Sequence, residues 1–433
     1  MIKIAFIGLL LALTLSSEGA QAQLRLPGGI GGHLPDLGRP LRGDDGLIRR
    51  PLEAALAPLN LQALSEQLLG QHPVELMRNP AGELIVRRQL LALPSGPAAR
   101  ERLLALAEVS LLEETKLDGL DIGWLLLRAD VGLLPRLRAL DPEGTYDYQH
   151  LYLGSGEVGG AAPTSRATNQ DAAPSSARVG LIDSGVDAQH PALRSANVQR
   201  YGCGGTAHPA AHGTAVASLL VGRDRGNDGG SEGGKFRGVL PGATLYAADA
   251  YCDAPDGGSV QAIAQSLAWL ARERVGVINI SLVGPPNALL QRAVAAAQSK
   301  GHLIVAAVGN DGPAAPPLFP AAWPGVVAVT GVDSRRRVLA EAGRGSHVAL
   351  AAPGSEMVGA GLAARSGYVA LRGTSFAAPL VAGLLAARLP QADVSRAAEA
   401  LATLRSQAID LGAAGRDDIY GWGLVGEALR NKP

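Results

Sequence analysis

Short apolar runs alternate with helical stretches over the second half of the chain, from about Ala177 to Gly426. Runs that are apolar at nearly every position are typical of strands buried on both faces, and the helices between them supply the crossovers that parallel strands need. The pattern predicts an α/β domain with a mostly parallel sheet covered by helices on both faces. The expected strands are 179–182, 244–247, 277–280, 303–307 and 326–330, and the expected helices are 214–221, 259–273, 288–300 and 377–389.

A smaller unit precedes this domain, over residues 52–153. Its apolar patterning predicts the order strand, helix, strand, strand, helix, strand, which is the split βαβ arrangement of ferredoxin-like α+β folds. Residues 154–177 are rich in Gly, Ser, Ala, Thr and Pro and are expected to form a flexible linker to the main domain, residues 178–433. A small domain, an exposed linker and a large domain suggest a proenzyme, and two domains on a simple tether are the alternative.

The start of the chain predicts export. Lys3, an apolar run from Ile4 to Leu15 and Ala20-Gln21-Ala22 have the pattern of a signal peptide over residues 1–22. A Pro/Gly/Arg-rich leader of low order is expected over 23–51. No later run is long enough to span a bilayer, so a secreted or periplasmic protein without a stable membrane anchor is predicted. The 39 basic and 39 acidic residues balance, which gives no reason to expect a nucleic-acid partner.

The predicted export affects how the two cysteines are interpreted. Cys203 and Cys252 lie in loop-like sequence, and an oxidising environment favours a disulfide between them over two free thiols. On the chain-entropy model such a bridge contributes roughly 4 kcal/mol, a figure that tends to be too high.

Three residues suited to acyl transfer stand where loops meet regular elements. Asp183 follows the expected strand 179–182, His212 opens an expected helix of small residues, and Ser375 lies in a Gly-Thr-Ser segment that runs into an apolar helix. A serine needs a base to become nucleophilic, an imidazole can be that base, and a carboxylate can hold the imidazole in the right tautomer. A capping serine alone would be the simpler interpretation of Ser375, but the Asp and His upstream favour catalysis.

A fourth group follows the expected strand 303–307. Asn310 is flanked by glycine-containing loop sequence, and its amide together with the backbone N–H of Ser375 could donate to a developing oxyanion. Loss of one such donor costs about 2.7 to 4 kcal/mol in an enzyme where the loss has been measured.

These segments resemble those of the subtilisin-like serine proteases: VGLIDSGVD, HGTAVAS, AAVGNDG and GTSFAAP occur in the family's order. The resemblance implies a subtilisin-like fold, an Asp-His-Ser triad, protein or peptide substrates and a substrate-binding edge strand at Ser281, Leu282, Val283 and Gly284. Val283 stands where many relatives have glycine, which suggests a narrowed specificity pocket. The small domain is similar in pattern to the family's inhibitory propeptide, so it is expected to act as an intramolecular inhibitor.

No cofactor is expected. Relatives often bind calcium, but residues 227–232 offer too few regularly spaced oxygens to specify a site, and no metal ligand is assigned. Two functions stay open: a secreted endopeptidase made as a proenzyme, and a non-catalytic binding protein on a protease scaffold whose cleft is blocked by the N-terminal domain. The presence of all four site residues favours the enzyme.

Overall fold

The computed structural model describes residues 61–154, 156–162, 177–224, 236–362 and 367–432. The chain divides into a unit of residues 1–52 and a unit of residues 53–433, and every described residue belongs to the second. The predicted signal peptide and leader, most of the predicted linker and the loop 227–232 lie outside the described residues.

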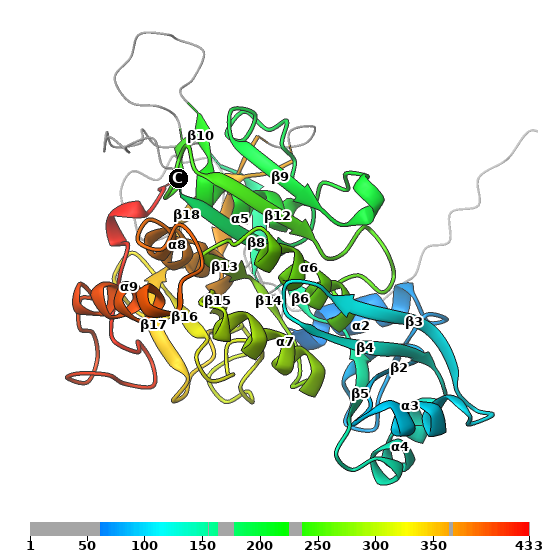
Figure 1. Cartoon of the computed structure of the whole chain (residues 1–433). Helices are drawn as coiled ribbons and strands as arrows, with labels where there is room; N and C mark the ends of the chain where they lie inside the picture. The colour runs from blue at the N-terminus through cyan, green and yellow to red at the C-terminus, as the bar shows by residue number, and fades with distance from the viewer. Residues whose placement is uncertain (1–60, 155, 163–176, 225–235, 363–366, 433) are drawn as a thin grey trace, which may run out of the picture. The chain divides into compact units, whose positions relative to one another are not determined.

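A seven-stranded sheet organises the larger part of the structure (Figure 1), and all of its neighbouring strands run parallel. This confirms the predicted fold class. The strands lie in the order β17 (Val348–Pro353), β16 (Val327–Val332), β15 (Leu303–Ala307), β13 (Val277–Ile280), β8 (Arg178–Asp183), β12 (Thr244–Asp249) and β9 (Asn197–Tyr201).

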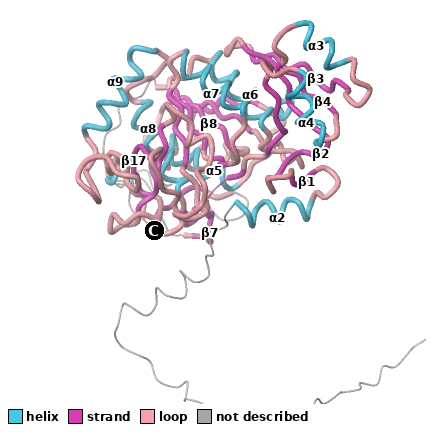
Figure 2. Tube along the Cα trace, turned by 90° about the horizontal axis from the view of Figure 1, so that it is seen from below, coloured by secondary structure: helices cyan, strands magenta, loops and turns pink. Residues whose placement is uncertain are grey.

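Helices cover both faces of this sheet, as Figure 2 shows for α5 (Ala211–Val221) and α7 (Ala288–Ser299) on opposite sides of β8. Successive strand residues point to opposite faces, and β8 follows this rule. Its Leu181 lies in the core shared with α5 and α8 (Thr374–Ala386), whereas Ile182 lies in the core shared with α6 (Val260–Arg272) and α7. Helix α9 (Val394–Ser406) packs beside α8.

The helices that carry the predicted site residues begin earlier than expected. Helix α8 begins at Thr374 instead of 377, and α5 begins at Ala211 instead of 214. Both helices consist largely of small apolar residues and are buried almost throughout, so tertiary packing sets their first turns. Ser375 and His212 therefore each lie in a first helical turn.

The smaller α+β unit, residues 61–152, has its own sheet, in which β5, β2, β4 and β3 are antiparallel neighbours in that order. This is the predicted split βαβ order. Helix α2 and strand β1, which also pairs with β2, were not predicted. The elements are α2 (Leu61–Gln71), β1 (Leu76–Arg78), β2 (Leu84–Leu93), α3 (Pro97–Leu104), β3 (Ser110–Leu117), β4 (Ile122–Arg128), η1 (Val131–Leu133), α4 (Leu134–Leu140) and β5 (Thr145–His150).

The start of the predicted linker is ordered as strands. Strand β6 (Leu153–Gly154) pairs with β14 (Leu282–Val283), and β7 (Glu157–Ala161) pairs with β19 (Tyr368–Arg372), all antiparallel. The flexible linker predicted from residue 154 is thus wrong for these residues, because two edge strands of the larger part supply hydrogen-bond partners. The remaining short elements are η2 (Cys203–Gly205), β10 (Arg223–Asp224), β11 (Phe236–Arg237), β18 (Met357–Ala360) and η3 (Glu427–Leu429).

Candidate active site

Asp183 and His212 are brought together as predicted. Asp183 is the last residue of β8, and its Oδ1 atom accepts a hydrogen bond from Nδ1 of His212 at 2.8 Å. The carboxylate is fully buried, and Oδ1 also accepts from the backbone N–H of Ser184 at 2.7 Å and from its hydroxyl at 3.2 Å. These donors offset the cost of burying a charge, and the bond to Nδ1 leaves Nε2 as the basic nitrogen of a neutral imidazole.

Nε2 of His212 is buried and has no hydrogen-bond partner among the described residues. The ring lies 5.5 Å, between centroids, from the ring of Phe376, which directly follows Ser375. The histidine therefore lies next to the first turn of α8 with its acceptor nitrogen unused. An imidazole in this state can take a proton.

Ser375 is fully buried in the first turn of α8. Its hydroxyl donates to the carbonyl oxygen of Ser281 at 3.2 Å, while the Ser281 hydroxyl donates back to the carbonyl oxygen of Ser375 at 3.0 Å. Asn279 donates to the Ser281 hydroxyl at 2.9 Å. The end of β13 thus holds the serine turn from one side, and the positive end of the helix dipole acts at the same place.

Asn310 lies beside the same turn. Its Oδ1 atom accepts from the backbone N–H of Thr374 at 3.1 Å, and the Thr374 hydroxyl accepts from the N–H of Gly309 at 3.2 Å. Two hydrogen bonds therefore tie the loop after β15 to the residue before Ser375. The predicted oxyanion donor lies next to the predicted nucleophile.

Residues 151–154 and 156 of the chain itself lie in this site. Leu151 forms a bridge with Ser259, and the N–H of Tyr152 donates to the carbonyl oxygen of Gly258 at 2.8 Å. On the other side, Leu153 pairs with Val283 and Gly154 pairs with Leu282. The segment is therefore held in an extended form between β14 and the loop before α6, in the way in which β-augmentation holds a peptide.

Two glycines of this segment lie close to His212 and Ser375. A Cβ atom at Gly154 would lie 3.3 Å from the His212 ring, and one at Gly156 would lie 3.2 Å from Cβ of Ser375. All the predicted substrate-binding residues line this path: Ser281, Leu282, Val283 and Gly284 form or flank β14. Val283 is buried against Leu153, its partner in the strand pair.

Sequence reasoning missed two supporting side chains. The Ser184 hydroxyl accepts from the N–H of Gly213 at 3.0 Å while it donates to Asp183, so it links the carboxylate to the start of α5. The Asn279 amide holds Ser281 in the same way. The sequence offers only one sign of these two roles, which is that Ser184 and Asn279 each stand next to motif residues. The roles themselves depend on contacts between segments that are distant in the sequence.

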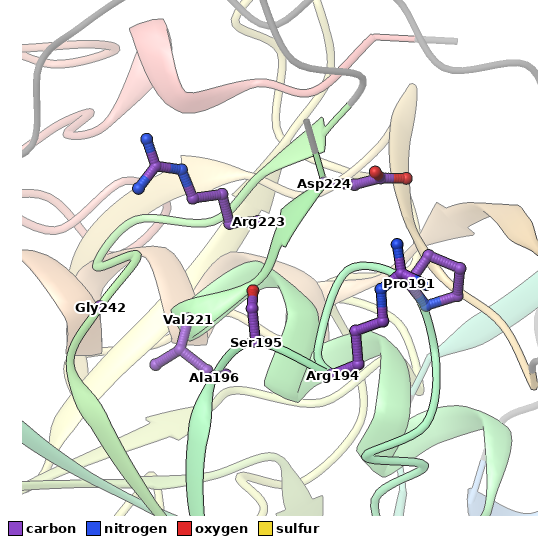
Figure 3. A pocket seen from close by; sticks show the side chains of 8 residues that line it. All are labelled: Pro191, Arg194, Ser195, Ala196, Val221, Arg223, Asp224 and Gly242. Atoms are coloured by element: carbon purple, nitrogen blue, oxygen red, sulfur yellow. The ribbon is translucent and has the colours of Figure 1, made fainter. Parts of the chain in front are cut away.

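One cavity lies away from these residues. Figure 3 shows a pocket of about 380 Å³ whose side chains include Arg194, Arg223 and Asp224. It reaches Val221 at the far end of α5, nine residues from His212 and about 14 Å along a helix. The Asp224 carboxylate accepts from the Tyr368 hydroxyl at 2.7 Å. This pocket is separate from the triad.

Cys203 and Cys252 lie at disulfide distance, with their Cα atoms 5.1 Å apart, as the sequence suggested. Among the described residues, the one cluster of potential metal ligands consists of these two cysteines and Asp249. Because both sulfur atoms are joined to each other, the cluster is a disulfide with a neighbouring carboxylate.

No helix within the described ranges is both long and apolar enough to cross a bilayer.

Comparison with known proteins agrees with this geometry. The profile of the family described as "Subtilase family" matches residues 175–423, more than half of the chain. Subtilisin Savinase of Lederbergia lenta is 34% identical over 263 residues, which are 60% of this chain and 92% of that protein. The minor extracellular protease Epr of Bacillus subtilis is 31% identical over 215 residues, 49% of this chain, and the match spans only 32% of Epr.

A solved structure shows the same fold. Fervidolysin from Fervidobacterium pennivorans, a keratinolytic enzyme related to subtilisin, aligns with a TM-score of 0.65 over 81% of this chain and 62% of its own, at 19% identity. The matched region of the family profile contains all seven strands of the parallel sheet, helices α5 to α9 and all four predicted site residues. The chain belongs to the subtilase family.

Proposed function

We propose that this chain is a secreted serine endopeptidase made as a proenzyme, in which Asp183, His212 and Ser375 act as a catalytic triad. One observation carries the proposal: an extended segment of the chain lies between β14 and the loop before α6, with Gly154 beside His212 and Gly156 beside Ser375. A peptide bond held in this way is placed for attack by Ser375. The adjacent His212 can assist, because its Nε2 atom has no hydrogen-bond partner among the described residues.

The reaction follows from these positions. Oγ of Ser375 attacks the carbonyl carbon while Nε2 of His212 takes the hydroxyl proton, and Asp183 stabilises the imidazolium through Nδ1. Asn310 and the Ser375 N–H donate to the oxyanion. His212 then gives the proton to the leaving amine, which leaves an acyl-enzyme that water hydrolyses with His212 again as base. Each proton transfer uses His212, so the scheme requires no metal ion.

The same geometry supports autoinhibition. Because a Cβ atom at Gly156 would lie 3.2 Å from Cβ of Ser375, we infer that the bond to be cut is the one before Gly156, and the new N-terminus would begin with Gly156. The small α+β unit would then stay bound through the segment that ends in the cleft and block it. This narrows the sequence prediction, which placed the cut between about 151 and 177.

Export rests on the predicted signal peptide, and Epr is named an extracellular protease. The alternative of a non-catalytic binding protein on a protease scaffold has no observation in its favour.

The test compares the full chain with Ser375→Ala, both expressed in an oxidising compartment. We expect the native chain to shorten itself before Gly156 and to digest casein, while Ser375→Ala stays at full length and is inert. If both stay inert, a trace of trypsin is added to each. Activation of the native chain alone then supports the triad with an external activator, and inactivity of both contradicts the proposal.

A further inference from the structure

Glu341 is a buried acid that the proposed reaction does not use. It lies in the loop between β16 and β17, and its side chain is only 8% exposed. Nη2 of Arg372 donates to its Oε2 atom at 2.9 Å, and Nε of the same arginine lies 2.8 Å from Oε1. Two close contacts with one guanidinium offset the cost of burying the charge, so this ion pair is a firm link between two segments of the chain.

Arg372 belongs to the strand that leads to the proposed nucleophile. It is the last residue of β19, Gly373 follows it as the N-cap of α8, and Ser375 lies in the first turn of that helix. Its partner across the sheet is Glu157, whose Oε2 atom is buried without a hydrogen-bond partner among the described residues, so that oxygen does not compete for the guanidinium. The ion pair with Glu341 therefore connects the start of α8 to the loop between β16 and β17.

The backbone around Glu341 holds the other half of the site. Its carbonyl oxygen accepts from the N–H of Gly312 at 2.8 Å, and the N–H of Gly343 donates to the carbonyl oxygen of Gly309 at 3.1 Å. These two hydrogen bonds fall on either side of Asn310. The same short stretch of chain thus holds the loop that carries Asn310 at both of its ends.

The contacts of Thr374 already join the two segments beside Asn310. They hold the loop only near its first residues, because Oδ1 of Asn310 accepts one of these hydrogen bonds and the N–H of Gly309 donates the other. Gly312, at the far end of the loop, is held by Glu341. The link through Glu341 therefore prevents the loop from rotating about its contacts with Thr374.

The two proposed oxyanion donors come from these two segments. Asn310 supplies a side-chain amide and Ser375 a backbone N–H, and both must lie about 3 Å from one developing oxygen atom. A displacement of about 1 Å can cost about a hundredfold in rate. We propose that Glu341 is a positioning residue that sets the distance between the two donors, because its carboxylate holds Arg372 and its carbonyl oxygen holds Gly312. This rests on the proposed function, which gives the two donors their task.

The first test measures peptide hydrolysis by the full chain after activation and by its Glu341→Gln variant, which keeps the size of the side chain and removes its charge. We expect kcat to fall about thirtyfold and KM to change less than about twofold. The matched control is Glu427→Gln, because Glu427 accepts two hydrogen bonds of 2.8 Å from Arg336 and is far from the site in the sequence. Unchanged kcat in Glu341→Gln, an equal fall in both variants, or a rise in KM alone would overturn the inference.

A transition-state analogue separates positioning from a general loss of stability. Oγ of Ser375 adds to the carbonyl carbon of a peptide trifluoromethyl ketone while His212 takes the hydroxyl proton, and the carbonyl oxygen becomes an oxyanion. The Ki of this inhibitor should rise about thirtyfold in Glu341→Gln, whereas the Ki of the matching alcohol, which cannot form an oxyanion, should not change. Equal changes for the two inhibitors would contradict the inference.

A double substitution shows whether Glu341 acts through Arg372. Arg372→Gln leaves the buried carboxylate without its cation, so it should lower kcat at least as much as Glu341→Gln does. The two substitutions together should cost no more than Arg372→Gln alone, because both break the same link. Falls in kcat that multiply would show that the two residues act independently and would refute the inference.

A last measurement does not depend on catalysis. In the Ser375→Ala chain, hydrogen exchange of the Gly312 amide reports how firmly the far end of the loop is held. Adding Glu341→Gln should raise its exchange rate about tenfold, while adding Glu427→Gln should leave it unchanged. Equal exchange rates in the two variants would contradict the inference. If the native chain hydrolyses no peptide, the catalytic proposal has failed, and this exchange comparison still decides whether Glu341 holds the loop.

Discussion

Asp183 can keep its charge in a fully buried place because three donors converge on one of its oxygens. Two of these donors come from Ser184, whose hydroxyl also accepts from the N–H of Gly213 at the start of α5. The serine thus fixes the distance between the carboxylate and the helix that carries His212. It is a positioning residue, since it contacts neither the cleft segment nor Ser375 in any described hydrogen bond.

The Ser184→Ala substitution is expected to lower kcat about tenfold and to leave KM nearly unchanged. One hydrogen bond to a charged group is lost, equivalent to about 1.4 kcal/mol, and the His212 ring is held less firmly while the peptide strands are untouched. Steady-state kinetics on one peptide measures both constants. Ser184→Thr keeps the hydroxyl and should restore most of the rate. A rise in KM with unchanged kcat would argue against positioning.

Helix α2 is one of the elements that the sequence did not predict. Its sequence LQALSEQLLGQ has no acidic residue in the first turn and no basic residue in the last, so charged side chains at its ends do not stabilise the helix dipole. Its stability comes from contacts: Leu64 and Leu68 pack against the cluster that contains Leu151 and Leu153. Its first N–H, that of Leu61, donates to Oδ1 of Asp311 at 2.7 Å.

Helix α2 therefore covers the outside of the segment that lies in the cleft. Leu64→Glu is expected to release the small unit at least tenfold faster after cleavage, because it places a charge against an apolar cluster. Gln67→Glu is the matched control, since Gln67 is exposed on the same helix. The lag before peptide hydrolysis begins measures the release. Equal lags for the two variants would show that α2 does not hold the segment.

Five of the seven strands of the parallel sheet were predictable because they are apolar at nearly every position, a pattern typical of strands that are buried on both faces. Strand β17 and the mostly exposed strand β9, whose sequence is NVQRY, were not predicted. The places of Asp183, His212 and Ser375 were predictable because each residue ends a strand or opens a helix within a recognisable motif. The path of residues 151–154 and 156 was not predictable, since Gly154 and Gly156 look like linker residues. This path depends on pairs between residues that are distant in the sequence, such as Gly154 with Leu282 and Val158 with Leu371.

At the scale of the whole chain, the small unit and the larger part meet at the start of α7. Oδ1 of Asn287 accepts from the N–H groups of Leu289 and Leu290, so its Nδ2 is the donor to Nδ1 of His150 at 2.9 Å. Nε2 of His150 must then carry its proton and donate to Glu83 at 3.0 Å. Asp147 also accepts from the N–H of Ala288 at 2.8 Å.

This chain of hydrogen bonds gives the molecule a component of stability that acid removes. The hydrogen bond from His150 lowers the pKa of Glu83 below its ordinary 4.5, although partial burial opposes the shift. A lowered pKa in the folded state means that the contribution is complete above about pH 4.5 and is lost as the pH falls through the folded value.

Replacing Glu83 by Gln removes this titration. In the Ser375→Ala background, which prevents self-cleavage, we expect Glu83→Gln to lower the free energy of unfolding of the small unit by about 1 kcal/mol at pH 7. The difference from the parent should shrink towards zero on acidification below 4.5, because the parent then loses the same charge. Urea unfolding followed by tryptophan fluorescence at several pH values measures it. If the difference in free energy of unfolding stays constant with pH, the charge of Glu83 does not hold His150 against Asn287. The small unit and the larger part would then be joined mainly by the segment in the cleft and by α2.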